Sequence, residues 1–283
     1  MGKVWQVDFD RRPLQDTEGY PLWELVVYDP QTQMACQRWC PEPDVSSLWL
    51  AAQLQELFML MAPKPTHLQV FRPRTLSILQ EISERLGIIL EAQRRTMGLK
   101  QVLQMRSQHY PQMSEYTGQA YDPLWVEQLP PQPLPEALWG EQWQFVTLAA
   151  TELESGLLQR PIPLQDIPSQ LLPSQLSLAV TTPVPGVLIN GGRRSMQLAQ
   201  WIQQRQPMTL TARRAELSGL ILAAGLNERY VLVTYDDPDM VLVAQKFEQD
   251  QHNSQGLHFL LIQPDDSGVT YTGLWLLSTV GCS

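Results

Sequence analysis

Two short segments of the chain combine arginines with the start of a helix, and both could bind phosphate. Residues 71–75 (FRPRT) and 192–195 (GRRS) each close an apolar run and open a helical pattern. Thr75 and Ser195 are residue types that cap helix N-termini, where backbone N–H groups attract anions. The planar guanidinium group of arginine binds phosphate oxygens in pairs and stacks on bases. These residues and spacings predict two phosphate-binding edges.

Both segments lead through a helix into a second apolar run that ends in another arginine pair. These pairs are Arg94 and Arg95 after the first helix, and Arg213 and Arg214 after the second. The repetition predicts an internal duplication with a basic edge in each copy, and it favours a nucleic-acid-binding protein. The predicted RNA-binding residues, including two arginines after the first strand, are Arg11, Arg12, Arg72, Arg74, Arg94, Arg95, Arg193, Arg194, Arg213 and Arg214.

The charge balance limits this interpretation to local sites. The chain has 283 residues and a net charge of −9, which disfavours indiscriminate binding to polyanions. Lysine occurs only at Lys3, Lys64, Lys100 and Lys246, so sixteen of the 20 basic residues are arginines. That bias fits RNA recognition, although a general replacement of lysine by arginine would give the same composition.

Length and composition favour a two-lobed protein of the cytoplasm. A hydrophobic content of 43% over this length can bury a substantial core, and two domains of ordinary size are expected. No apolar run approaches the ~20 residues of a membrane span, and the N-terminus lacks the pattern of a signal or transit peptide. Cys36, Cys40 and Cys282 do not form a disulfide framework, and the histidines show no ligand spacing. Neither a metal site nor a cofactor is expected.

The first half of the chain predicts three strands followed by alternating helices and strands. The strands are expected over residues 4–9, 22–28, 34–39, 68–71 and 88–92, and the helices over 48–61, 76–86 and 97–106. An antiparallel trio followed by right-handed crossovers is the element order of the ribonuclease H-like fold. Parallel strands in such a sheet end at one edge, where we expect residues 10–12, 72–74 and 94–95 to converge.

A magnesium-dependent nuclease is an alternative interpretation of that edge. Phosphoryl chemistry of this kind needs several carboxylates that hold about two metal ions. Asp8, Asp10, Glu24 and Glu56 are available on the early elements, but the later parallel strands end in arginines. We therefore expect Asp8 to be an ordinary carboxylate that pairs with a neighbouring arginine, Arg11 or Arg12.

The second half predicts a further α/β lobe after a proline-rich linker. We expect an N-terminal lobe over 1–120, a linker over 121–140 and a C-terminal lobe over 141–283. Strands are expected over residues 143–149, 176–180, 186–189, 217–224, 230–235, 257–262 and 273–277, with helices after residues 193 and 237. The expected architecture is therefore α/β with mixed sheets, ribonuclease H-like in the first lobe and a related duplicate in the second.

The chain resembles the RNA-binding translation factors of cyanobacteria and plastids called Tab-two, and Atab-two in land plants. The resemblance extends over essentially the whole chain. It rests on residues 5–9 (WQVDF), 22–25 (LWEL), 46–50 (SSLWL), 71–72 (FR), 94–96 (RRT), 110–113 (YPQM), 133–135 (PLP), 140–143 (GEQW), 225–229 (GLNER), 256–259 (GLHF) and 273–277 (GLWLL).

This resemblance implies binding to the 5′ untranslated region of the messenger RNA for a photosystem I reaction-centre subunit, and promotion of its translation without catalysis. The family's C-terminal signature falls on Trp275, Leu276 and Leu277. On a strand with alternating faces, at least one side of that signature is expected in the core. Plastid members carry transit peptides, which are not apparent before Val4, so a cyanobacterial member is expected.

Two function classes remain beside the leading hypothesis of a non-catalytic RNA-binding protein. The runner-up is an assembly or scaffold protein for photosystem biogenesis, in which the arginines form intramolecular salt bridges. The third is the divergent nuclease, which Asp8-dependent cleavage of RNA would support.

Overall fold

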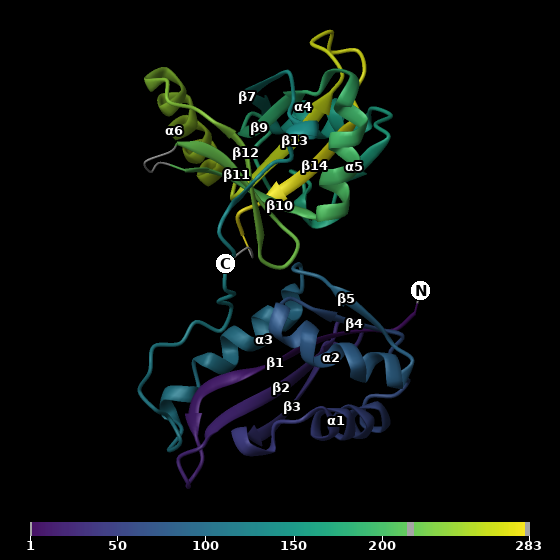
Figure 1. Cartoon of the computed structure of the whole chain (residues 1–283), viewed down its shortest axis with the longest axis vertical. Helices are drawn as coiled ribbons and strands as arrows, with labels where there is room; N and C mark the ends of the chain where they lie inside the picture. Colours follow the sequence, from purple (N-terminus) through teal and green to yellow (C-terminus); the bar gives the residue numbers. More distant parts are fainter. Residues whose placement is uncertain (1, 214–217, 281–283) are drawn as a thin grey trace. The chain divides into compact units, whose positions relative to one another are not determined.

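The computed structural model describes residues 2–213 and 218–280, so Arg214 lies outside the described residues. The chain divides into two compact units, Met1–Glu127 and Gln128–Ser283. They are called unit 1 and unit 2 below, and Figure 1 shows both. No helix within the described ranges combines the length and apolarity needed to cross a membrane.

Unit 1 is built on one five-stranded sheet with the strand order β3-β2-β1-β4-β5. The first three strands are antiparallel neighbours, and β4 and β5 run parallel to β1. The strands are β1 (Val4–Gln15), β2 (Pro21–Asp29), β3 (Met34–Pro41), β4 (His67–Val70) and β5 (Ile89–Ala92). This order and these directions confirm the predicted ribonuclease H-like arrangement.

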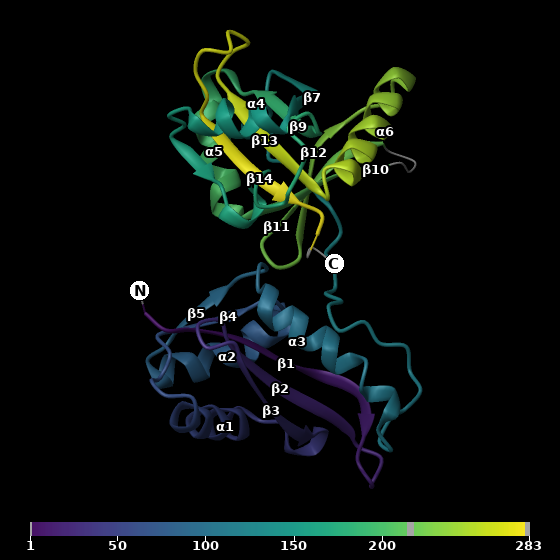
Figure 2. The same cartoon turned by 180° about the vertical axis from the view of Figure 1, so that it is seen from behind.

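Helices cover both faces of this sheet, because β1 and β2 alternate side chains between two cores. The helices are α1 (Ser47–Leu60), α2 (Pro73–Leu86) and α3 (Met97–Ser107). Helices α1 and α2 pack on Trp5, Val7 and Phe9, whereas α3 packs on the opposite face around Val26. Figures 1 and 2 show α1 and α3 on opposite sides of β1–β3. Gly87 ends α2 in the left-handed conformation at φ 63°, as the sequence predicts.

The two predicted helix caps are wrong by a few residues. Arg72 occupies the N-cap of α2 and Pro73 is its first residue. Thr75 is buried in the first turn, where its hydroxyl donates to the Phe9 carbonyl at 3.2 Å. Ser195 is the first residue of α5 (Ser195–Arg205) and follows a 3-10 turn. Both side chains are therefore buried inside the first turn of the helix and do not occupy the N-cap position.

Residues 121–127, the first part of the predicted linker, return to the α3 side of the unit 1 sheet. Leu124 and Val126 are buried there in the same cluster as Val26. The backbone carbonyls of Pro123 and Trp125 accept hydrogen bonds from the guanidinium group of Arg72. This segment, called the strap below, is therefore part of unit 1.

A buried network of charges holds the strap, β1 and β2 together. Asp8 Oδ1 accepts from Arg72 Nε at 2.8 Å, and Asp8 Oδ2 accepts from Arg12 Nη2 at 2.7 Å. Arg12 also donates to Glu24 Oε2 at 2.9 Å and to the hydroxyl of Tyr121, at the start of the strap, at 2.8 Å. The side chains of Asp8, Arg12 and Glu24 have no solvent exposure. Each charge is therefore compensated inside the protein.

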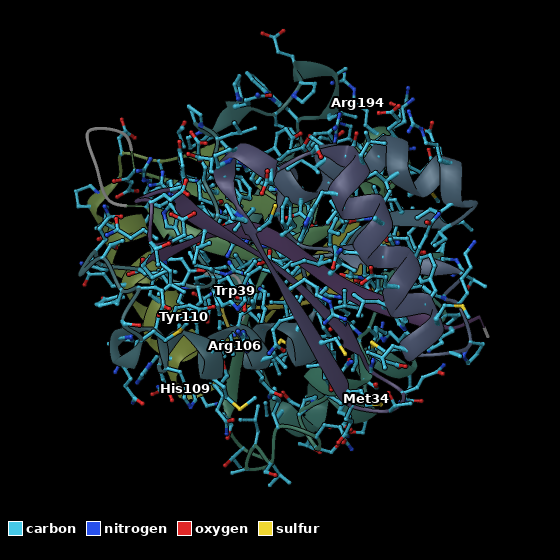
Figure 3. The ribbon with its side chains drawn as sticks, turned by 90° about the horizontal axis from the view of Figure 1, so that it is seen from below. Met34, Trp39, Arg106, His109, Tyr110 and Arg194 are labelled. Atoms are coloured by element: carbon cyan, nitrogen blue, oxygen red, sulfur yellow. The ribbon has the colours of Figure 1, made fainter. Side chains whose placement is uncertain are left out.

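The outer part of this network comes from α3 and from the 3-10 turn Tyr110–Gln112 that follows it. Arg106 Nε donates to Glu24 Oε1 at 2.7 Å, and the Tyr110 hydroxyl donates to Glu24 Oε2 at 2.7 Å. Arg106 also lies 5.7 Å from the ring of Trp39, which contacts Tyr110 edge-on (Figure 3). The network thus joins β1, β2, β3, α3 and the strap.

The described residues of unit 2 form two sheets and three α-helices. One sheet has the order β7-β9-β13-β14-β8 and the other β10-β11-β12-β6. Their strands are β6 (Gln132–Pro133), β7 (Gln142–Ala149), β8 (Leu164–Asp166), β9 (Pro183–Asn190), β10 (Pro207–Arg213), β11 (Gly219–Ala224), β12 (Glu228–Thr234), β13 (Leu257–Gln263) and β14 (Gly273–Ser278). Helices α5 and α6 (Pro238–Asn253) and the second sheet pack on one face of the first sheet, and α4 (Ala150–Ser155) packs on the other.

The expected duplication does not appear in the connections of the two arginine-bearing units. In unit 1, β4 and β5 on either side of α2 are parallel neighbours in one sheet. In unit 2, β9 and β10 on either side of α5 belong to different sheets. The repeated sequence pattern indicates only that a helix follows a strand in both places, which is common in α/β folds.

The strand predicted over residues 176–180 is also wrong. This segment forms turns, with local backbone hydrogen bonds from Leu176 N–H to the Leu172 carbonyl and from Leu178 N–H to the Pro173 carbonyl. Leu176 and Leu178 are partly buried against the core and explain the apolar pattern.

The C-terminal signature lies in the core on both faces of β14. Trp275, Leu276 and Leu277 have no exposed surface. Trp275 and Leu277 face one core cluster, Leu276 faces the other, and the Trp275 indole donates to Gln203 Oε1 at 2.7 Å. These residues stabilise unit 2, as expected for at least one side of the strand.

His258 on β13 is fully buried in a site built for the neutral ring. Nε2 accepts from the Leu210 backbone N–H at 2.9 Å, and Nδ1 lies 2.9 Å from the Gly256 carbonyl, to which it donates. Burial lowers the pKa of His258 to about 4. A proton on Nε2 would point at the Leu210 N–H, so the charged ring does not fit.

We expect this histidine to make unit 2 less stable in acid. In the unfolded chain His258 becomes protonated below pH 6.5, whereas in the folded protein the buried ring stays neutral down to about pH 4. The contribution of His258 to the free energy of unfolding is therefore fully present above pH 6.5. It falls by about 1.4 kcal/mol per pH unit as the pH decreases from 6.5 to about 4. Denaturant unfolding of the wild type and of His258→Gln, at pH 7, 5.5 and 4.5, should show a weaker pH dependence in the variant. Parallel curves would contradict this assignment.

We expect the charge network to fail when one arginine is removed. Arg72→Met leaves two strap carbonyls without a donor and Asp8 with half of its compensation, which should cost about 3–5 kcal/mol. Thermal unfolding and protease cleavage near residues 121–127 would measure the loss. The matched control is Arg74→Met, because the Arg74 side chain is 61% exposed and its removal should change stability by about 0.5 kcal/mol or less. Equal stability of the two variants would contradict the role of the network.

Candidate nucleic-acid interface

The carboxylates in the middle of β1 are paired with arginines. Alternation along β1 places Asp8, Asp10 and Arg12 on one face, and the antiparallel register places Glu24 opposite Asp10. Burial raises the pKa of Asp10 although Arg72 opposes the effect. Burial alone would lower the pKa of Arg12, but Asp8, Tyr121 and Glu24 raise it well above its usual value. The site therefore favours the guanidinium form of Arg12.

Arginines already occupy the Asp8 carboxylate that the nuclease interpretation would use. Both oxygens of Asp8 accept hydrogen bonds from guanidinium groups, as expected for an arginine-paired carboxylate. No group of three or more His, Cys, Asp or Glu residues is placed to hold a metal ion in the part of the chain that the structure describes. The predicted pairing of Asp8 with Arg12 is confirmed.

Three of the predicted RNA-binding arginines are buried in the interior of unit 1. Arg12, Arg72 and Arg94 are 2%, 6% and 4% exposed, so the RNA contacts expected of them do not fit this structure. For Arg12 and Arg72 the cause is the carboxylate pair on β1 and β2, which sequence spacing did not connect to them. Arg106 belongs to the same network and was missed, because it ends a helix and does not follow a strand.

The remaining arginines of unit 1 lie closer to solvent. Arg11 is exposed and Arg95 is half-buried. Arg74 is exposed, lies 4.3 Å above the ring of Trp23, and approaches Asp10 to 4.0 Å. These side chains could reach a phosphate, but the buried arginines beside them could not.

In unit 2 the arginine pair after β9 remains at the surface. Residues Gly192–Arg194 form a 3-10 turn that leads directly into α5, and both Arg193 and Arg194 are exposed. Arg194 Nη1 lies 3.4 Å from the Glu136 carbonyl, and Figure 3 labels this arginine. The Arg193 side chain makes neither an ion pair nor a hydrogen bond with any described residue. The pair is therefore available to an anion.

Two glycines allow this tight turn. A Cβ at Gly191 would lie 2.6 Å from Ser195 Cα, and Gly192 has φ 56°. A Cβ at Gly192 would also lie 1.9 Å from Glu141 Oε1, so the Glu141 carboxylate lies directly over the turn. The sequence Asn190-Gly191-Gly192 lacks a nucleotide-binding glycine pattern, but its backbone brings the two arginines to the start of α5.

A cavity of about 330 Å³ lies beside the arginine pair. Its walls are mainly apolar and include Leu134, Trp143 and Ile189. A second, open hollow is lined by Arg193, Arg194, Glu136 and Glu141, and the two share Trp139 and Gly140. The site therefore combines an apolar cavity, an aromatic side chain and two cations.

Trp139 is the residue of this site that sequence reasoning missed. It falls within the predicted linker, yet residues 128–140 belong to unit 2 and form one wall of the cavity. Its side chain is 55% exposed, and its indole N–H donates to the Leu134 carbonyl at 2.9 Å. A tryptophan among prolines, next to the quoted GEQW motif, was the available signal.

Of the last predicted pair, Arg213 and Arg214, only Arg213 belongs to the described structure. Arg213 is exposed at the end of β10, in the second sheet of unit 2, and Arg214 lies outside the described residues. Burial lowers the pKa of Arg229, and the charge of Arg213 lowers it further.

Comparison with known proteins gives matches over nearly the whole chain. Residues 4–106 match the family described as RNA-binding protein Tab2/Atab2 N terminal, and residues 121–278 match the RNA-binding protein Tab2/Atab2 C-terminal domain. "Protein TAB2 homolog, chloroplastic" of Arabidopsis thaliana is 29% identical over 281 residues, which cover 97% of this chain and 74% of the relative. The protein of the same name from Zea mays is 30% identical over 283 residues, with 97% and 71% covered.

Among solved structures, retroviral integrases share a small part of the architecture. The catalytic core domain of HTLV-2 integrase has a TM-score of 0.27 and 19% identity, covering 36% of this chain and 68% of that domain. That of BIV integrase has a TM-score of 0.27 and 15% identity, with 38% and 66% covered. This likeness is too small to bear on function. The family matches, in contrast, cover both units, and the chain belongs to the Tab2/Atab2 family of RNA-binding proteins.

Proposed function

We propose that this chain is a non-catalytic protein that binds the 5′ untranslated region of a photosystem I reaction-centre messenger RNA and promotes its translation. The family supports RNA as the partner. The choice of messenger, and action in the cytoplasm of a cyanobacterial cell, follow from the sequence resemblance. The observation that carries the proposal is the exposed pair Arg193 and Arg194 beside the exposed Trp139.

This combination suits single-stranded RNA. Arginines that contact phosphates hold the backbone, and an exposed aromatic ring stacks on an unpaired base. The net charge of −9 makes such a site depend on local geometry, because the protein as a whole repels a polyanion.

Other arginines of the original set remain in the proposal as further phosphate contacts. They are exposed or half-buried in the described structure, except for Arg214, which lies outside it. They are Arg11, Arg74, Arg95, Arg213 and Arg214.

A scaffold for photosystem assembly is the second candidate, and one feature favours it. Helix α1 exposes three large apolar side chains, Leu48 at 73%, Met59 at 85% and Leu60 at 61%. Apolar residues gathered on one element are typical of protein-binding surfaces. The internal ion pairs of Arg12 and Arg72 also agree with the structural role that this alternative gives to arginines.

The test is direct binding of the full chain to a photosystem I subunit leader RNA and to an unrelated RNA of equal length, over a salt series with and without magnesium. Tighter binding of the leader, without cleavage, supports the proposal. Equal binding of both RNAs removes the messenger assignment, and no binding at physiological salt favours the scaffold. Magnesium-dependent cleavage that a folded Asp8→Asn variant lacks would overturn the non-catalytic assignment.

We expect Arg193→Ala combined with Arg194→Ala to weaken RNA binding and flatten its salt dependence. Each lost phosphate contact should reduce the slope of log K against log salt by about 0.7, hence about 1.4 for the pair. Thermal stability should stay unchanged, because both side chains are exposed.

Arg160→Ala is the matched control for the double variant. Arg160 is another exposed arginine of unit 2 and is not among the residues that line the cavity or the arginine hollow. Its removal should leave the salt slope unchanged. The same loss of slope in Arg160→Ala, or none in the double variant, would contradict the site.

A further inference from the structure

We propose that the cavity beside Trp139 receives one unstacked nucleobase of single-stranded RNA, while the flanking phosphates lie at Arg193 and Arg194. This inference rests on the proposed function and adds a base-binding pocket to it. A cavity of about 330 Å³ is at the small end of ligand sites, so it suits a single ring system better than a larger ligand.

Aromatic side chains give the cavity two surfaces for a flat ring. Trp139 lines the cavity and is 55% exposed. Trp143 lies in the wall, where Phe145 at 5.3 Å and Tyr235 at 5.8 Å hold its ring in place. The hydrogen bond from Trp139 to Leu134 also restrains the indole before any ligand arrives. A pre-ordered ring loses little conformational entropy on binding.

Polar groups for the edge of a base come from β12 and from the rim. Strand β6 pairs with β12 only at Tyr230 and Val231 among the described residues. Leu232–Thr234 line the cavity beyond that pairing, and they offer backbone groups at the border of a sheet. Gln142 and Thr234 add exposed polar side chains. Such groups can bind the edge of an unpaired base.

The position of the arginines connects base and phosphate. Ile189 lines the cavity, and Arg193 follows four residues later through the glycine turn. Because both hollows share Trp139 and Gly140, a base in the first places its own backbone at the second. The charge is complementary to phosphate, although Glu136 and Glu141 also line the second hollow.

These carboxylates point to a nucleotide and not to free phosphate. They weaken the attraction of the arginines for a bare anion, but carboxylates accept hydrogen bonds from ribose hydroxyls, as acidic residues do in dinucleotide sites. The Glu141 carboxylate lies over Gly192, next to the arginine pair. An RNA strand should therefore bind better than DNA of the same sequence.

The test uses the full chain and a single-stranded RNA that carries 2-aminopurine at one position in turn. At one position the fluorescence should be quenched on binding, and Trp139→Ala should abolish that quenching and weaken binding about 10- to 100-fold. Trp139→Phe should restore most of the affinity. Trp125→Ala is the matched control, because Trp125 is a similarly exposed tryptophan of unit 1, and this variant should bind as the wild type does.

A second variant fills the cavity without removing an aromatic ring. Val233→Phe places a larger side chain at the half-buried cavity wall and should weaken binding in a protein that unfolds at the wild-type temperature. If Trp139→Ala and Val233→Phe bind RNA normally while the double arginine variant does not, the base pocket is wrong and the RNA-binding function stands.

The base pocket and the RNA-binding function can also be tested separately if the wild type binds no RNA. Ligand-observed NMR with adenosine monophosphate would then test the cavity alone. Binding by the wild type and not by Trp139→Ala would support the pocket while the RNA function fails. The absence of binding to both RNA and the mononucleotide would overturn both.

Discussion

The compensation of buried charge at Asp8 organises unit 1. An isolated carboxylate in this position would be costly, and each arginine that pairs with it is itself a buried charge that needs further partners. Arg72 therefore reaches two carbonyls of the strap, and Arg12 reaches Glu24 and Tyr121. Because no member is satisfied by one neighbour alone, elements that are distant in sequence must meet at one place. The strap is part of unit 1 for this reason as well as for its two buried apolar side chains.

The same residue type behaves differently in unit 2, because its neighbours differ. Arg193 and Arg194 follow β9 much as Arg72 follows β4, but the strands beside the end of β9 carry Gln142 and Gln263. Gln263 donates to the Asn190 side chain at 2.8 Å, which satisfies those groups without a charge. No described residue of unit 2 places a buried carboxylate against these arginines. A guanidinium group is then most stable in water, and this leaves the pair free for a ligand.

The sequence predicted most elements and their order, since these depend on local periodicity. The alternation along β1, the apolar period of α2 and the left-handed Gly87 are all visible within a few residues. The direction of an arginine is not local: Arg72 is buried because Asp8 lies 64 positions earlier on the neighbouring strand. Trp139 was missed because the local sequence was misleading. The prolines around it predicted a linker, whereas the chain forms a wall of a cavity there. The false strand at 176–180 shows that burial of Leu176 and Leu178 gives an apolar pattern without any sheet partner.

Counting basic residues therefore overstates the surface that RNA can contact. Arg12, Arg72 and Arg94 are buried, so three of the predicted contacts add no positive field at the surface where a polyanion would approach. An acidic protein with so few exposed arginine pairs gains little from counterion release. Affinity for a particular RNA must then come from contacts that do not depend on charge, and stacking on a restrained ring is the strongest of these for an unpaired base. A cavity next to an arginine pair can combine the two contributions, and recognition of the base lets such a protein discriminate among RNAs that all carry the same backbone charge.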